Sequence, residues 1–270
     1  MLDLFTLEFV RYALIMSILL AVLFGLLSFF AIMRKMAFLG AGIAHTAFGG
    51  VALGVFFGID PFYSSLVFCI LSALLIGKMV RYGNISYDTL IGIFFAFSMA
   101  LGALLIAMRR AYTFDLAGYL FGNILGVTLF DLISALIVLI LFVPFLLLFL
   151  QKILFMTFDE KVASVSGIHV QTLDTFLLVF FATIIVVSIK IVGIVLVSAL
   201  VVLPASFGLI FSKNFRRVIT ISILYTLIIM IGGLYVSYQC NTPAGATIVV
   251  LGTLIYFLCF IANRLRNSYI

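Results

Sequence analysis

His45 is the residue in this chain whose type and position most clearly offer chemistry. It stands in the middle of an apolar, glycine-rich run, 36–58, that is long enough to cross a membrane. An imidazole can bind a divalent metal ion or a proton, and an ionisable side chain is costly in hydrocarbon. A histidine in such a run is therefore a candidate for a role in moving ions.

A second group of candidates follows the eighth apolar run, in the string YVSYQCNTPAGAT. Asn241, Pro243 and Gly245 would interrupt a continuous helix. Transporters use broken helices as binding sites, because irregular backbone at membrane depth must line a cavity or be covered by protein. Cys240 and Asn241 are therefore candidate polar groups beside a pathway. The same segment also fits an outer turn that binds nothing.

A third candidate lies in the longest connection predicted to face the cytoplasm, about 152–171. Asp159 and Glu160 favour a helix N-terminus there, and Gly167 is placed to end that helix. One interpretation is a solvated helix with no further role. The other is a docking element for a cytoplasmic partner.

The elements that must position these residues are membrane helices. With 66% hydrophobic and 9% charged residues, the chain cannot present a polar surface to water on all sides. A helix needs about 20 apolar residues to cross the bilayer. We predict an all-α polytopic bundle of about nine such helices, with eight to ten possible, in a single transmembrane domain, 1–270. The segments are 11–33, 36–58, 62–80, 89–108, 130–150, 172–189, 191–211, 218–238 and 244–262.

Three features between or within these segments affect the topology. The stretch 111–128 is too polar for a simple span, and we predict a short helix at the outer surface. Lys190 separates two apolar segments and predicts a short outer turn. Pro204 lies within a segment and should kink it.

The distribution of Lys and Arg predicts the orientation, because these residues accumulate in cytoplasmic loops. With the N-terminus outside and nine spans, eleven of the fifteen basic residues lie inside, and the C-terminus is cytoplasmic. The net charge of +6 then reflects topology in a lipid bilayer, and it gives no indication of nucleic-acid binding.

Several kinds of chemistry are missing from the sequence. It has no H-E-x-x-H or G-x-S-x-G motif and no carboxylate cluster, so an enzyme is a distant alternative. It has no phosphate-binding G-x-x-x-x-G-K-[ST] loop, so ATP-driven transport would need another polypeptide. Its three scattered cysteines indicate neither a disulfide framework nor a closed zinc site. These observations favour a transport subunit without an intrinsic cofactor, served by an external ATPase.

Seven strings stand out along the chain between about 33 and 255. They are, in order, MAFLGAGIAHTAFGGVALG, DPFYSSLV, DTLIGI, YLFGNILGVT, MTFDEKVASVSGIHVQ, KIVGIVLVSALVVLPA and TPAGATIVVL. Together they resemble the permease subunits of ABC transporters for metal uptake, the ABC-3 family, which serves zinc, manganese or iron. The similarity is greatest to the bacterial zinc permeases.

The resemblance implies a set of partners and a place in the cell. The permease would be a homodimer in the bacterial cytoplasmic membrane, with two copies of a cytoplasmic ATP-binding subunit that hydrolyses ATP. An extracellular or periplasmic metal-binding protein would deliver the metal. The loop at 157–170 would be the coupling helix that contacts the ATPase. Its candidate contact residues are Phe158, Asp159, Glu160, Lys161, Val162, Ala163 and Gly167.

The chain departs from the family pattern at two acidic positions. The family's second span carries roughly G-D-A-x-x-H-A, and this chain reads GAGIAHT, with Ala41 at the aspartate position. The outer motif is commonly D-x-P-[SA]-G, and here Asn241 replaces its acid. Imidazole and thiolate suit zinc better than they suit manganese. The hypothesis is that His45, with Asn241 or Cys240, transiently contacts Zn²⁺. The rival hypothesis is a path without a high-affinity site, from which ions are released quickly.

The sequence thus predicts ATP-driven import of a divalent metal ion, zinc first and manganese or iron next. A vitamin B12 or iron-siderophore permease is an alternative, but its substrate needs a wide cavity. A passive metal channel is another alternative, and it would need no coupling helix.

Overall fold

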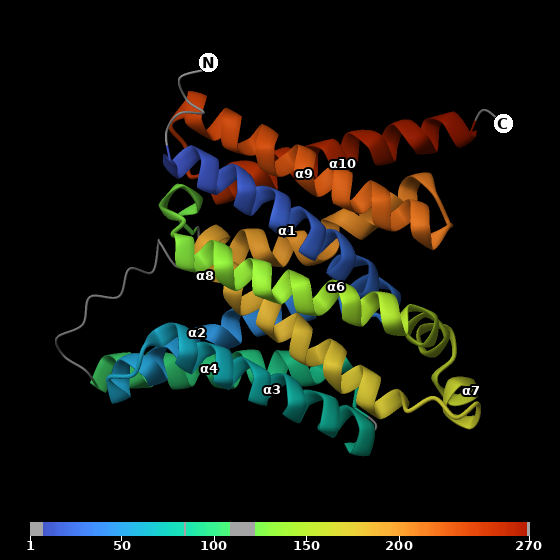
Figure 1. Ribbon diagram of the computed structural model, residues 1–270, viewed down its shortest axis with the longest axis horizontal. Helices are drawn as coiled ribbons and strands as arrows, with labels where there is room; N and C mark the ends of the chain where they lie inside the picture. Colours follow the sequence, from blue (N-terminus) through green and yellow to red (C-terminus); the bar gives the residue numbers. More distant parts are fainter. Residues whose placement is uncertain (1–7, 84, 109–121, 269–270) are drawn as a thin grey trace. The chain divides into compact units, whose positions relative to one another are not determined.

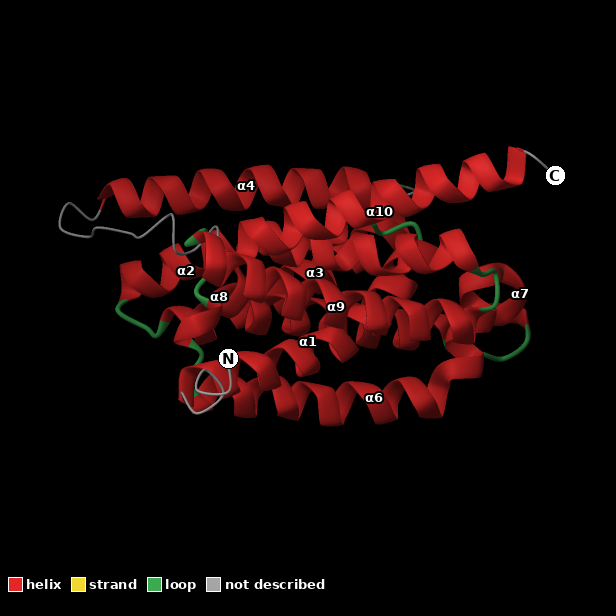
Figure 2. Cartoon of the chain, turned by 90° about the horizontal axis from the view of Figure 1, so that it is seen from above, coloured by secondary structure: helices red, strands yellow, loops and turns green. Residues whose placement is uncertain are grey.

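The computed structural model describes residues 8–83, 85–108 and 122–268. This part of the chain is helical and contains no strand, and Figure 2 shows its helices joined by short loops. The elements are α1 (Glu8–Met33), α2 (Leu39–Phe57), α3 (Pro61–Gly83), α4 (Tyr87–Met108), η2 (Ile124–Gly126), α6 (Leu129–Phe158), α7 (Glu160–Val165), α8 (Val170–Phe211), α9 (Phe215–Cys240) and α10 (Ala244–Ser268).

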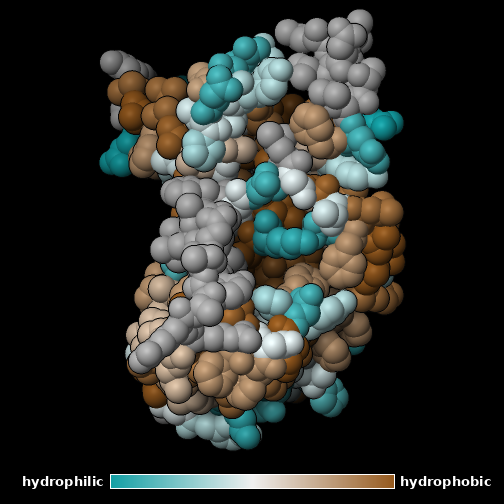
Figure 3. All heavy atoms as spheres, turned by 90° about the vertical axis from the view of Figure 1, so that its left-hand side faces the viewer, coloured by the Kyte–Doolittle hydropathy of each residue, from teal (hydrophilic) through white to brown (hydrophobic). Residues whose placement is uncertain are grey.

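Eight of the helices in the described residues are long and apolar enough to cross a membrane. They are α1 to α4, α6 and α8 to α10, whereas α7 has six residues. The prediction of an all-α polytopic membrane protein is confirmed. Figure 3 shows hydrophilic side chains gathered among hydrophobic ones on the face that it views.

The predicted segments 172–189 and 191–211 lie in one helix, α8, which has 42 residues. At about 1.5 Å per residue, such a helix would be roughly 63 Å long, about twice the thickness of the hydrocarbon core. However, Gly193 has φ 78° and ψ 165°, which breaks the helical backbone and leaves two arms, 170–192 and 194–211. Glycine adopts this conformation without a steric penalty from a Cβ.

The sequence predicted that Lys190 lies in an outer turn, and this prediction is wrong. Lys190 lies within α8, three residues before the break, because Gly193 reorients the backbone without a separate loop. Pro204 lies inside the second arm, and the helix continues through it. The Ser28 hydroxyl accepts a hydrogen bond from Ala205 N at 2.9 Å, so a side chain supports the backbone next to the proline.

The contacts divide the chain into two compact units. Unit 1 comprises 1–40, 115–135 and 188–270, and unit 2 comprises 41–114 and 136–187. In unit 1, α9 packs against both α1 and α10, and in unit 2, α3 packs against α4. Figure 1 labels the helices, and α6 and α8 each contribute residues to both units. The prediction of a single permease domain over 1–270 stays a prediction.

Most of the predicted outer segment, 111–128, falls outside the described residues. Its described end contains the single turn η2, which is capped by the Asn123 side chain accepting from Gly126 N. Gly122 has φ +69°, and a Cβ added there would overlap the backbone of Gly193. The end of this segment thus lies directly against the break in α8.

Gly122→Ala is expected to destabilise the protein, because alanine has both an unfavourable φ and a backbone clash at this position. The expected cost is roughly 1–3 kcal/mol, measured as a lower melting temperature of the detergent-solubilised protein. Gly232→Ala in α9 is the matched control, since nothing lies within 4 Å of an added Cβ there. Equal melting temperatures for the two variants would contradict the proposed contact.

Candidate functional site

His45 lies on a strip of α2 that the rest of the chain leaves partly open. His45 and Ala41 are half-buried, whereas 42–44 and 46–52 are all buried. Residues four apart share one face of a helix. The two positions that the metal-permease motif pairs are therefore side by side and accessible together.

Helix α4 supports the imidazole of His45 from one side. The ring of Phe95 meets it edge-on, with centroids 4.8 Å apart and an interplanar angle of 80°. A Cβ at Gly42 would overlap the Ile91 side chain, and one at Gly49 would lie 2.8 Å from the carbonyl oxygen of Ser98. Small residues on α2 thus allow α4 to approach closely and hold Phe95 against His45.

The imidazole of His45 has no hydrogen-bond partner among the described residues, in which its ring contact is with Phe95. The same residues contain no group of three or more His, Cys, Asp or Glu side chains that could hold a metal ion together. A closed zinc site needs four ligands. What His45 can offer is a single nitrogen donor.

Cys240 and Asn241 lie where α9 ends, as the sequence predicted. Asn241 caps the helix in the left-handed conformation, with φ 52° and ψ 43°, which asparagine tolerates better than most residues. Its backbone N–H donates to Ser237 O, and α10 begins at Ala244. The predicted interruption is confirmed, and it joins two long helices.

The structure exposes the side chains of both Cys240 and Asn241. They belong to unit 1, whereas His45 belongs to unit 2. Helix capping is in itself a sufficient reason for an asparagine at 241. A shared metal contact of His45 with Asn241 or Cys240 stays a prediction.

The helix predicted in the cytoplasmic connection is present as α7. The Asp159 side chain accepts a hydrogen bond from Val162 N at 3.0 Å and caps its N-terminus, and Glu160 occupies the first turn. At the other end Gly167 has φ +82° and donates its N–H to Ser164 O. The predicted start and end of this helix are both confirmed.

Helix α7 presents apolar side chains outward. In α7, Ala163 is fully buried, whereas Val165 is 90% exposed and Val162 49%; just before it, Phe158 at the end of α6 is 82% exposed. Val162 and Val165 are three residues apart and share a face. Lys161 is also exposed. Because α7 is too short to cross a membrane, Val162 and Val165 are candidates for a contact with another protein.

A cavity of about 530 Å³ lies beside α7, between the end of α6 and the start of α8. His169 belongs to its wall. The lining residues are Phe145, Phe149, Lys152, Gly167, Ile168, His169, Thr172, Leu173 and Phe176. The link between α7 and α8 thus forms part of the wall of a cavity.

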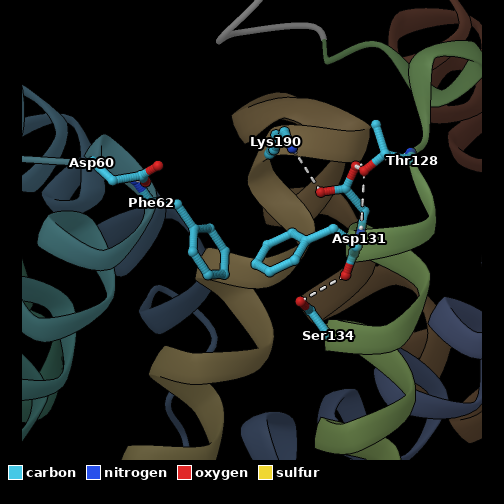
Figure 4. A network of polar contacts seen from close by, with 7 residues as sticks. Asp60, Phe62, Thr128, Asp131, Ser134 and Lys190 are labelled. Carbon is cyan, nitrogen blue, oxygen red and sulfur yellow. Dashed lines mark hydrogen bonds and ion pairs between the residues drawn. The ribbon is translucent and has the colours of Figure 1, made fainter.

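An ion pair in unit 1 was missed by the sequence reasoning. Lys190 Nζ lies 2.8 Å from Asp131 Oδ1, and Asp131 is only 5% exposed (Figure 4). Thr128 donates to the other carboxylate oxygen from its hydroxyl at 2.6 Å and from its backbone at 3.0 Å. A threonine three residues before an acid at the start of an apolar run is a helix-capping signal that could have revealed Asp131's local role. Nothing local indicates Lys190 as its partner.

Substitution of Lys190 and substitution of Asp131 are expected to lower the stability of the protein by different amounts. Lys190→Met leaves a buried carboxylate without its cation, whereas Asp131→Asn leaves an ammonium that is 56% exposed and can be solvated. We expect Lys190→Met to cost roughly 1–3 kcal/mol and Asp131→Asn clearly less. Thermal unfolding in detergent measures both. A larger loss for Asp131→Asn would contradict the burial asymmetry.

Known proteins resemble this chain over nearly its whole length. Residues 6–263 match the family described as the ABC 3 transport family. The chain is 33% identical to a manganese transport system membrane protein of Listeria monocytogenes, covering 94% of this chain and 90% of the relative. It is 30% identical to a high-affinity zinc uptake system membrane protein of Haemophilus influenzae, covering 91% of this chain and 94% of the relative.

A solved structure agrees with these relatives. PsaBC from Streptococcus pneumoniae, in complex with Fab, matches with a TM-score of 0.82 and 30% identity, over 95% of this chain and 92% of the solved one. These similarities agree with the ordered motifs of the sequence and with its long membrane helices, because all three indicate a membrane transport subunit. The chain therefore belongs to the ABC 3 transport family and is a transmembrane permease subunit.

Proposed function

We propose that this permease imports a divalent metal ion, with zinc as the first candidate and manganese or iron next. The observation that carries the proposal is the imidazole of His45 on the accessible strip of α2, at the position of the family's metal motif. Similar proteins are named for manganese and for zinc transport, so their names favour neither metal.

The preference for zinc rests on the residues of this chain. Ala41 and Asn241 stand where the family motifs carry acids, so two hard oxygen ligands are absent from the proposed path. Imidazole nitrogen suits zinc, whereas manganese favours carboxylates. A single donor at His45 would hold the ion weakly and release it quickly, as transport requires.

Coupling to ATP hydrolysis is proposed to occur at α7. Two copies of a cytoplasmic ATPase would each contact the connection 157–170 of one permease in a homodimer. The exposed apolar side chains of Phe158, Val162 and Val165 support this role, because a water-soluble partner would cover them. Asp159, Glu160 and Gly167 define the ends of α7, which carries Val162 and Val165, and Ala163 anchors it; Phe158 is the last residue of α6.

The proposed orientation places α7 in the cytoplasm of a bacterium. The two arms of α8 allow nine crossings, with the N-terminus outside and the C-terminus inside the cytoplasmic membrane. Eleven of the fifteen basic residues then face the cytoplasm. An extracellular or periplasmic metal-binding protein would deliver the ion to the opposite side.

Uptake into vesicles tests the proposed function. The permease is reconstituted with its ATPase and its metal-binding protein, and zinc, manganese and iron are supplied in turn. The expected result is ATP-dependent uptake that is greatest for zinc. Equal uptake without the ATPase would instead indicate a passive channel. Uptake of vitamin B12 or an iron-siderophore in place of bare ions would overturn the substrate class.

A further inference from the structure

Polar side chains join the end of α3 and the start of α4 to the start of α8, all within unit 2. Arg81, in the last turn of α3, donates to the carbonyl oxygen of Gln171 at 3.3 Å and to Thr175 Oγ1 at 2.9 Å. Its Nε also donates to Gly77 O at 2.9 Å, which fixes the direction of the guanidinium. Arg81 thus binds α8 through two of its nitrogens.

Tyr87, the first residue of α4, makes the second connection. Its hydroxyl donates to Asp174 Oδ2 at 2.7 Å, and Asp174 is only 3% exposed. A short hydrogen bond to a buried carboxylate is stronger than one between neutral groups. Because 171, 174 and 175 share one face of a helix, Arg81 and Tyr87 hold the same face of α8.

The segment that Arg81 and Tyr87 hold follows α7 almost directly. Between them lie only Ser166 to His169, and this link is hydrogen-bonded: Ile168 N donates to Ala163 O at 3.1 Å, and Leu173 N donates to His169 O at 3.2 Å. A displacement of α7 therefore moves the first turn of α8, because the link has little slack.

Helix α4 connects this segment with the candidate ion site. Tyr87, Ile91, Phe95 and Ser98 follow one another at helical spacing on α4. Tyr87 binds α8, Phe95 contacts His45, and Ile91 and Ser98 meet the glycines of α2. One helix thus touches the start of α8 at its first residue and touches α2 over the next one to three turns.

We propose that Tyr87 and Arg81 are positioning residues of the transport cycle: they bind the first turn of α8 to α3 and α4, so that a displacement of α7 reaches Phe95 and His45. The inference rests on the proposed function, in which the ATPase moves α7. Neither residue contacts the ion. Their effect is on how much ion movement accompanies each hydrolysed ATP.

The test compares Tyr87→Phe with Tyr82→Phe in the full complex of permease, ATPase and metal-binding protein. Tyr82 is the matched control, since it is 80% exposed and close in sequence. For Tyr87→Phe we expect ATPase binding and hydrolysis as in the wild type, but roughly tenfold fewer zinc ions taken up per ATP. Arg81→Lys should act in the same direction, because an ammonium cannot reproduce the planar fork of donors. Tyr82→Phe should keep the wild-type ratio.

A second readout needs no metal. In complexes in which Cys240 and Cys259 are replaced by serine, Ala41→Cys is labelled with a maleimide, with and without a non-hydrolysable ATP analogue. The nucleotide is expected to change the labelling rate, and Tyr87→Phe to abolish that change. If the wild-type complex takes up no metal, the proposed function fails while this readout still tests the connection. Three results for Tyr87→Phe would overturn the inference. They are a wild-type ratio of zinc ions to ATP, an unchanged effect of the nucleotide on labelling, and loss of ATPase binding.

Discussion

Replacing His45 with alanine is expected to reduce ATP-dependent metal uptake by roughly tenfold or more, while the permease still folds and binds its ATPase. Loss of side chains that merely orient a metal ligand costs about 10–100-fold in affinity or activity, so loss of a direct donor should cost no less. The ring is half-buried and lies against Phe95, so its removal leaves a small gap and no unpaired buried group. Uptake of zinc into vesicles measures the effect.

Val51→Ala is the control that separates metal contact from packing. It removes a buried side chain from the same helix, α2, but leaves the imidazole of His45 in place. We expect uptake within about twofold of the wild type and a lower melting temperature, because buried methyl groups are lost. If His45→Ala transports zinc at the wild-type rate, the imidazole is not a contact for the ion.

Ala41→Asp tests the same strip of α2 in the opposite direction. The carboxylate would lie one helical turn from His45 and restore the acid of the family motif. An added oxygen ligand favours the harder ion, so manganese uptake should rise relative to zinc uptake. The ratio of the two rates in vesicles is the measurement. An unchanged ratio would place the ion path away from this strip.

Val165→Asp is expected to weaken binding of the ATPase by roughly thirtyfold or more. Val165 is 90% exposed on α7, so an aspartate there is solvated in the free permease and should leave its melting temperature unchanged. In the complex, the same carboxylate would be buried in an apolar contact. A hot-spot side chain contributes about 2 kcal/mol or more, which is roughly thirtyfold in Kd. Co-purification of the ATPase with tagged permease measures this loss.

Ser164→Asp provides the matched control on the same helix. Ser164 is exposed and adjacent to Val165, but it points to a different side of α7. The substitution adds the same charge without removing an apolar contact. We expect ATPase binding close to the wild type for Ser164→Asp. If both variants bind equally well, the apolar side of α7 is not the docking surface.

Features that depend on neighbouring residues were predictable from the sequence. The ends of α7 follow from Asp159, which caps the helix with its own side chain, and from Gly167, which adopts a positive φ. The end of α9 at Asn241 follows in the same way. Such capping interactions extend over three or four residues, so the local order of residue types is sufficient to predict them.

The position of Gly193 shows the limit of this reasoning. Between Phe176 and Phe211 the one charged residue is Lys190, and the sequence therefore predicted a loop at that charge. The structure instead turns at a glycine within the helix, against Gly122 from a distant part of the chain. A run of apolar residues indicates which part of the chain can lie in hydrocarbon, but it does not indicate where the backbone bends.

By itself, the sequence determined the class of protein, the membrane helices, the candidate donor at His45 and the family. These depend on composition, on apolar length and on short ordered motifs. Only the tertiary structure paired Lys190 with Asp131, 59 residues apart, and Tyr87 with Asp174, 87 residues apart. In a membrane protein most positions are apolar on every face, so hydropathy does not reveal which helices are neighbours. That choice is made by close packing and by the few polar groups that must find partners away from water.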